Sequence, residues 1–256
     1  MKTAKENAGK VNTLNSLSER YLSKGIYDKA LQTANTSLAL SGKLNFKIGI
    51  ANASHHIGNV YCNKAIYDTA LSYYIESLKI REDIGDKKGV ALSLSSIGNV
   101  YKRENQKEKA LDYYNQSLKI AEEIDDKRCI ATNLLNLGTI CRRNKEYEKA
   151  LGYYMKCLDI LQKLGDKQAI AITYNNIGNI YSETNQIEKA LDYQFKSLKI
   201  KEDFGDKNGI AICYNNISQS YSKKNDFKQS IQMAKKAIAL AQEVGLKDLM
   251  LSLIHI

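Results

Sequence analysis

Residues Tyr174–Tyr181 read Y-N-N-I-G-N-I-Y, and variants of this stretch return every forty residues along the 256-residue chain. Its central glycine, Gly178, belongs to a column whose other members are Gly58, Gly98 and Gly138, with Ser18 and Ser218 at the two ends. Its last residue, Tyr181, belongs to a second column with Tyr21, Tyr61, Tyr101 and Tyr221, in which Cys141 fills the one gap. A fixed period of this length is typical of a solenoid, where each repeat packs against its neighbours.

The composition indicates that each repeat is helical. The chain has no Pro and no Trp, and its β-branched residues do not alternate at the period of two that marks a strand. In the unit that opens at Asp166, that residue is a good N-cap, and a first helix, helix A, is expected to run to about Glu183. A second helix, helix B, is expected from about Ile187 to Phe204, where Gly205 ends it.

One turn separates helix A from helix B in each repeat, and a second turn leads from helix B to the next repeat. Asn185, between helix A and helix B, shares its column with Gly25, Asn105 and Asn225. Gly and Asn tolerate the left-handed conformation that ends a helix, so this column predicts the turn. The join between the first two repeats, residues 41–47, departs from the pattern, and we expect it to be looser than the others.

Small residues on both helices indicate close packing. Gly58 lies on helix A and Ala70 on helix B, and a repeated mid-helix glycine, which costs roughly 1 kcal/mol against alanine, needs a packing reason. The helix B pairs such as Tyr73-Tyr74 are interpreted as core or inter-repeat packing rather than as a platform for stacking bases.

These columns, with Tyr61, Tyr67 and Ser77, resemble the tetratricopeptide repeat over nearly the whole chain. The resemblance implies an all-α, right-handed α-solenoid of about six helix-turn-helix repeats, with helix A lining a concave groove. The forty-residue period departs from the usual length of about 34 residues, and the usual Pro after helix B is absent. Both departures resemble a longer-repeat subclass found in spindle-orientation adaptors, in kinesin light chains and in many bacterial regulators.

The repeat pattern predicts the following division of the chain: a frayed N-terminus, 1–7; repeats at about 8–46, 47–86, 87–126, 127–166, 167–206 and 207–246; the start of a truncated seventh repeat, 247–250; and a tail, 251–256. The tail reads L-S-L-I-H-I and resembles one reading frame of a transposon-end adapter used in sequencing libraries. We therefore expect it to be non-native; the alternative is a short apolar cap over the last repeat.

Charge and cysteine usage point to a reducing, cytoplasmic location. The net charge is +10, with Lys and Arg interleaved among Asp and Glu, which favours a solvated face over a nucleic-acid surface. The five cysteines form no C-x-x-C pair. No secretory h-region precedes Lys10, although an extracytoplasmic location remains an alternative if the N-terminus is incomplete.

No catalytic or metal-binding motif is present, so the sequence predicts neither an enzyme nor a cofactor. His55 and His56 are adjacent on a helix and therefore point about 100° apart, which suits them poorly as joint metal ligands. We interpret His56 as a groove residue and His55 as partly packed.

One face of helix A carries the candidate binding residues. Positions spaced i, i+4, i+7 and i+11 share a side of a helix, and on helix A that side is rich in Asn, a poor helix former that needs another reason to be there. A carboxamide donates and accepts, so it can bridge an extended peptide backbone, as the Asn rows of the resembling adaptors do. The predicted peptide-binding residues are His56, Asn59, Ser96, Asn99, Arg103, Asn136, Thr139, Arg143, Asn176, Asn179, Asn216 and Gln219.

Several alternatives stay open. The Asn side chains could instead bond across to a neighbouring helix and only set the stacking. Arg103 and Arg143 favour an acidic peptide as the partner of an interaction scaffold. The array could also be the sensory or partner-binding region of a larger, truncated bacterial signalling protein, namely a histidine kinase, nucleotide cyclase or transcription regulator. RNA binding by the basic surface is a third, weaker alternative.

Overall fold

The computed structural model of the protein describes residues 2–246, with side chains from residue 7 onward, and this part of the chain is all helical. The helices are α1 (Lys2–Ser23), α2 (Tyr27–Lys43), α3 (Lys47–Asn63), α4 (Tyr67–Asp83), α5 (Lys87–Arg103), α6 (Lys107–Glu123), α7 (Lys127–Arg143), α8 (Tyr147–Leu164), α9 (Lys167–Glu183), α10 (Ile187–Asp203), α11 (Lys207–Lys223) and α12 (Phe227–Val244). Odd-numbered helices are helix A of each repeat and even-numbered ones are helix B. The predicted all-α solenoid is confirmed. The expected seventh helix A and the tail, residues 247–256, lie outside the described residues.

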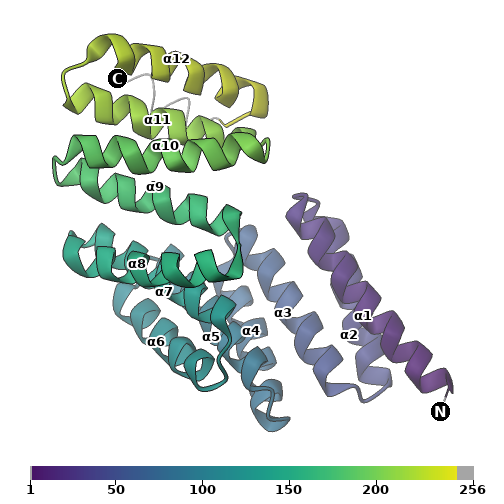
Figure 1. Cartoon of the computed structure of the whole chain (residues 1–256). Coiled ribbons are helices and arrows are strands. Elements are labelled where there is room, and N and C mark those ends of the chain that lie inside the picture. The colour runs from purple at the N-terminus through teal and green to yellow at the C-terminus, as the bar shows by residue number, and fades with distance from the viewer. Residues whose placement is uncertain (1, 247–256) are drawn as a thin grey trace. The chain divides into compact units, whose positions relative to one another are not determined.

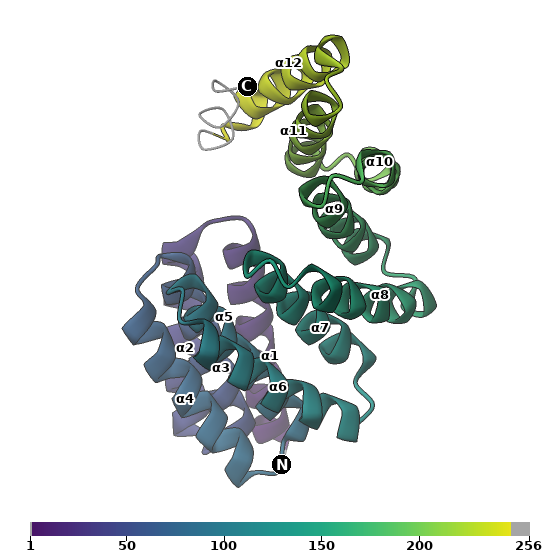
Figure 2. The same ribbon diagram turned by 90° about the vertical axis from the view of Figure 1, so that its left-hand side faces the viewer.

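The chain divides into two compact units whose boundary falls inside α7, between Asn133 and Leu134. Within each unit, every helix packs on the helices that precede and follow it in the chain, as the run from α1 to α6 and the run from α8 to α12 show (Figure 1 and Figure 2). Each unit is therefore built by stacking sequence neighbours, as the forty-residue period requires.

Every turn between helices contains one residue in the left-handed conformation. The predicted members Gly25, Asn105 and Asn185 have φ of 72°, 59° and 59°. Ala65 and Lys145, in the same column, take φ of 58° and 62°, although neither residue favours this region. The turn geometry is therefore imposed by the packing of the two helices and not only by the residue at the turn.

The expectation of a looser join over residues 41–47 is wrong. Asn45 has φ of 52°, and α3 begins at Lys47, so the join has the same form as the others. Asparagine serves there as glycine does elsewhere, because its short polar side chain tolerates the left-handed region. At the N-terminus, α1 begins at Lys2, so the stretch expected to be frayed is helical from its second residue. It contains no Gly or Pro before Gly9 to interrupt a helix.

Aspartate caps most helix A segments, as predicted for Asp166 and Asp206. The Oδ1 of Asp166 accepts a hydrogen bond from the Ala169 N–H at 3.1 Å, and the Oδ1 of Asp206 accepts one from Gly209 N–H at 2.9 Å. Each satisfies a backbone donor that the first helical turn leaves without a partner.

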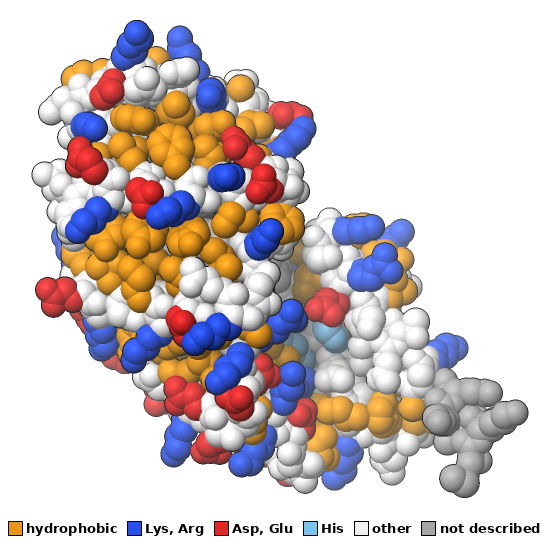
Figure 3. All heavy atoms as spheres, in the orientation of Figure 1, with side chains coloured by type: hydrophobic (Ala, Val, Ile, Leu, Met, Phe, Trp, Pro, Cys, Tyr) orange, Lys and Arg blue, Asp and Glu red, His pale blue; other side chains and the backbone are white. Residues whose placement is uncertain are grey.

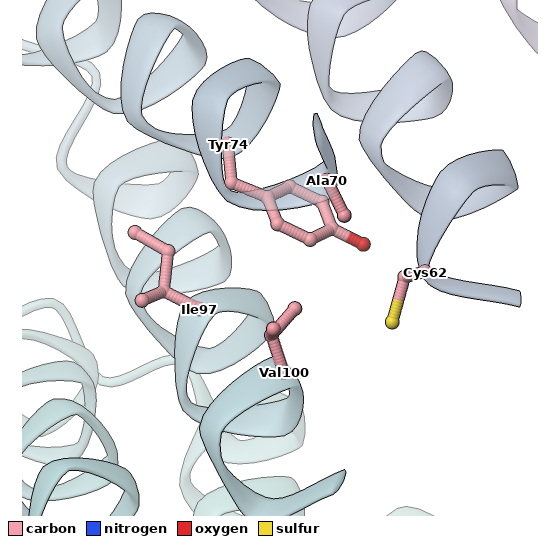
Figure 4. Packing of buried hydrophobic residues seen from close by; sticks show 5 residues of the cluster. All are labelled: Cys62, Ala70, Tyr74, Ile97 and Val100. Atoms are coloured by element: carbon pink, nitrogen blue, oxygen red, sulfur yellow. The ribbon is translucent and has the colours of Figure 1, made fainter. Parts of the chain in front are cut away.

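The glycine column makes room for an aromatic ring of helix B. A Cβ added at Gly58 would lie 2.8 Å from Cδ1 of Tyr74, and one added at Gly138 would lie 2.6 Å from Cε1 of Tyr154. Figure 4 shows the Tyr74 ring beside Ala70, in a cluster with Cys62 of α3 and with Ile97 and Val100 of α5. The interpretation of the helix B tyrosine pairs as packing residues is confirmed for the second member of each pair, Tyr74, Tyr114 and Tyr154, which is buried, whereas the first member is half-buried.

No disulfide joins the five cysteines, and four of them are buried. Across residues 2–246, none of the helices combines the length and the apolar composition that crossing a bilayer requires.

Candidate functional site

The predicted binding face of helix A is partly used for packing inside each repeat. In α3 and α5, Asn59 and Asn99 are half-buried, and their Oδ1 atoms accept hydrogen bonds from the hydroxyls of Tyr74 at 2.6 Å and Tyr114 at 2.7 Å. These two carboxamide oxygens are therefore engaged by helix B. For Asn59 and Asn99, the alternative prediction that the Asn side chains bond to a neighbouring helix is therefore correct as far as the carboxamide oxygens are concerned.

In α7 the same position is Thr139, and it is engaged in the same way. Its Oγ1 accepts from the Tyr154 hydroxyl at 3.2 Å and donates to the Leu135 carbonyl at 2.8 Å. Arg143, one turn further on, is exposed, as Arg103 is at the end of α5. Neither arginine forms an ion pair with another residue in the described part of the chain.

In the second unit, the face is more open. Asn176 and Asn179 of α9 are half-buried, and Gln219 of α11 is exposed. None of the three hydrogen-bonds with another described residue. Asn216 differs, because its Nδ2 donates to the Oδ1 of Asn175 at 2.9 Å and so links α11 to α9.

A polar pocket of about 260 Å³ collects several of these residues. Its walls are Arg142, Asn179, Ser182, Glu183, Gln194, Asn216, Gln219 and Lys223. The sequence predicted Asn179, Asn216 and Gln219 as site residues but did not single out Gln194, which lies on α10 rather than on helix A. Gln194 could have been noticed in the sequence because it replaces the tyrosine found at Tyr74, Tyr114 and Tyr154, forty residues apart.

A second, larger pocket of about 490 Å³ lies in the first unit among α3, α5 and the start of α7. Asn52, Leu92 and Thr132 line it, together with the Arg81 side chain, which is 4% exposed. The guanidinium donates to Ser77 Oγ at 3.0 Å and to Asn52 Oδ1 at 2.8 Å. Burial lowers the Arg81 pKa, while the nearby Asp86 carboxylate opposes that shift. Leu92 and Thr132 lie one helical turn before the predicted residues Ser96 and Asn136, and the sequence did not reveal that they line a common pocket.

His56 lies on the predicted face and is half-buried, whereas Ser96 is buried at 8% exposed. Burial lowers the pKa of His56, and the Glu19 carboxylate on α1 opposes that shift. His55 is 5% exposed, so it is fully packed rather than partly packed as expected. Asn136 of α7, another predicted binding residue, is half-buried and is engaged in an interaction within the protein.

Comparison with family models identifies these repeats. Residues 49–123 and 129–203 match one tetratricopeptide repeat model, and residues 210–244 match a second one. The chain belongs to the tetratricopeptide repeat family. The resemblance carried by Gly58, Tyr61 and Ala70 is thereby confirmed.

Solved structures share the fold of this tetratricopeptide repeat protein. BtubC from P. vanneervenii has a TM-score of 0.74 at 21% identity, over 86% of this chain and 92% of BtubC. A Rap protein complexed with Competence and Sporulation Factor has 0.71 at 16%, over 94% and 77%. NprR in complex with its cognate peptide NprX has 0.66 at 15%, over 91% and 67%. At these identities the likeness shows the fold alone. A comparison with curated proteins returned no match.

Proposed function

We propose that this tetratricopeptide repeat array is an interaction scaffold that binds an extended, acidic peptide segment of a partner protein along the helix A face. The observation that carries the proposal is the set of unengaged carboxamides on α9 and α11. Asn176, Asn179 and Gln219 stand at helix positions that face solvent at least in part and hydrogen-bond with no other described residue. Each can donate to a peptide carbonyl and accept from a peptide N–H.

Charge supports the acidic character of the ligand. Arg103 and Arg143 end their helices exposed and without an internal carboxylate partner in the described chain. The whole chain carries a net charge of +10, which draws acidic segments towards it. Among structures of the same fold, one holds a cognate peptide, the NprR–NprX complex, and this lends support to a peptide as the ligand class.

The test replaces Asn176, Asn179 and Gln219 together with alanine. Peptides are first selected on the native full-length chain from a phage-displayed random library and measured by titration calorimetry. If each carboxamide contributes about 1 kcal/mol, affinity falls roughly 100-fold while the melting temperature stays unchanged.

The matched control replaces Asn59 and Asn99 with alanine. That change removes the hydrogen bonds that the Tyr74 and Tyr114 hydroxyls donate to these carboxamides, so it lowers the free energy of unfolding by roughly 0.5–1.5 kcal/mol for each hydrogen bond lost. The proposal fails if the triple variant on α9 and α11 binds the selected peptides as tightly as the native chain.

A further inference from the structure

The fifth repeat departs from a pattern that the second, third and fourth repeats keep. In those three repeats a buried helix B tyrosine, Tyr74, Tyr114 or Tyr154, donates its hydroxyl to the helix A residue fifteen positions earlier. In the fifth repeat this position is Gln194, so no hydroxyl reaches Asn179, which is the residue fifteen positions earlier there.

The residue that packs against this helix B position also changes in the fifth repeat. Tyr74 packs in one apolar cluster with Val100, which follows it by 26 residues. The residue 26 positions after Gln194 is Ser220, and its Oγ donates to the Gln194 Oε1 at 2.9 Å. The apolar packing of a tyrosine and a valine between the second and third repeats is thus replaced by a glutamine–serine hydrogen bond between the fifth and sixth.

This exchange leaves a hollow beside Asn179. Gln194 is shorter than tyrosine, and the polar pocket of about 260 Å³ is lined by Gln194 and Asn179. Gln194 is 1% exposed, and its Nε2 group is buried with no hydrogen-bond partner. A buried amide donor without an acceptor is destabilising, so its presence on a pocket wall calls for a ligand that supplies the acceptor.

One other donor on the pocket wall also lacks an acceptor. The Nε of Arg142 is buried without a partner, while its Nη1 donates to the Glu183 carboxylate. Lys223 contributes a second positive charge and donates to the Ser182 carbonyl at 2.8 Å. The pocket walls therefore carry two cations, Arg142 and Lys223, and one carboxylate, Glu183, which is already paired with Arg142.

We propose that this pocket receives the carboxylate of an acidic side chain, Asp or Glu, of the bound peptide, and so sets a sequence preference at one position. The inference rests on the proposed function for its biological setting. A carboxylate is an acceptor-only group, which matches unpartnered donors on Gln194 and Arg142, and charge-assisted hydrogen bonds are the stronger kind. The carboxamide of a Gln or Asn ligand offers one acceptor oxygen in place of two, and its NH2 group would meet a donor of the pocket.

The first experiment probes the pocket without any peptide. N-acetylglutamate N-methylamide is titrated into the full-length chain, and the side-chain amide and guanidinium signals are followed by NMR, with the glutamine analogue as the comparison. We expect saturable shifts of the Gln194 Nε2 and Arg142 Nε signals, with the glutamate probe at least about tenfold tighter. Equal shifts with both probes, or none with either, overturn the proposal.

The control restores the pattern of the second repeat with the double substitution Gln194→Tyr and Ser220→Val. This variant closes the pocket and retains a fold that Tyr74 and Val100 already support elsewhere in the chain. It should lose the glutamate response completely. Gln194→Met is the second variant, because it removes the Nε2 donor at nearly constant volume and should weaken the glutamate probe about tenfold even if the double variant does not fold.

Peptide selection separates this inference from the proposed function. Libraries selected on the native chain should show Asp or Glu enriched at one position. Libraries selected on the double variant, whose new tyrosine hydroxyl also occupies Asn179, should bind more weakly and without that preference. Identical selections from both chains would remove the pocket inference and leave the scaffold standing. Failure to select any peptide, with the glutamate probe still bound, would reject the peptide groove and keep the acidic pocket.

Discussion

At the scale of single residues, the fold strongly changes the protonation of His55. It is 5% exposed, and its ring centroid lies 5.2 Å from that of Tyr74. Burial lowers its pKa to about 3, with smaller contributions from the charges of Arg81 and His56. The folded protein therefore holds His55 neutral, while the unfolded chain protonates it below its ordinary pKa of 6.5.

The buried, neutral His55 makes the protein less stable at acidic pH. Because the unfolded state binds the extra proton, the free energy of unfolding falls as the pH drops from about 6.5 towards 3. The substitution His55→Asn copies Asn15, Asn175 and Asn215 of the same column. It should remove roughly 1.4 kcal/mol per pH unit from the slope of stability against pH.

Urea denaturation between about pH 4.5 and 6 measures this difference, since carboxylate effects common to both chains cancel. An unchanged slope in His55→Asn would show that His55 titrates normally in the folded protein.

At the scale of the elements, the pairing of helix A with helix B depends on a glycine facing a ring. Gly98 on helix A faces the ring of Tyr114 on helix B, and Gly138 faces the ring of Tyr154 in the same way. It explains why glycine persists in mid-helix despite its helix propensity.

Gly138→Ala tests this contact. The new Cβ would lie 2.6 Å from a ring carbon of Tyr154, a buried side chain with 0% exposure, so the ring or the helix must move. We expect a loss of stability of about 1–3 kcal/mol from overpacking, which exceeds the gain in helix propensity. Thermal or urea unfolding provides the measurement.

The matched control is Gly152→Ala on α8, where nothing lies within 4 Å of an added Cβ. There only the helix propensity changes, and stability should rise by about 0.5–1 kcal/mol. Equal effects at the two glycines would contradict the packing explanation.

At the scale of the whole molecule, the net charge of +10 is distributed among opposite charges. Lys64 pairs with Asp28, and Lys87 with Glu123, each joining residues 36 positions apart. On the face shown in Figure 3, Lys and Arg side chains are interspersed with Asp and Glu, and hydrophobic side chains gather between them. This face carries no unbroken basic surface of the kind that follows a nucleic-acid backbone.

Salt dependence distinguishes peptide from nucleic-acid binding. A protein making six to ten phosphate contacts loses about 10³–10⁵ in affinity between 50 and 200 mM salt. We expect the affinity for a selected acidic peptide to fall by only about tenfold over this range, because carboxamide hydrogen bonds are not screened as ion pairs are. Fluorescence anisotropy with labelled peptide and labelled single-stranded RNA measures both, and tight RNA binding with a steep salt slope would refute the scaffold.

The repeat, the helix pairs and most of the turns could be predicted from the amino-acid sequence. These features rest on local signals, such as the cap at Asp166 and the turn residue Asn185, and their repetition at forty residues makes each one visible several times. The sequence also placed the candidate binding residues on one face of helix A, since a helical period is enough to define a face.

Which of those residues are already hydrogen-bonded, and where a pocket opens, became clear from the packing of the helices. Asn59 accepts from a tyrosine fifteen residues away, whereas Asn179 has no such partner because Gln194 replaces the tyrosine. The left-handed turn at Ala65 and the full burial of His55 likewise come from neighbouring helices. The physical reason is that hydrogen-bond partners and burial depend on how side chains from separate helices meet, and the period along one helix does not contain that information.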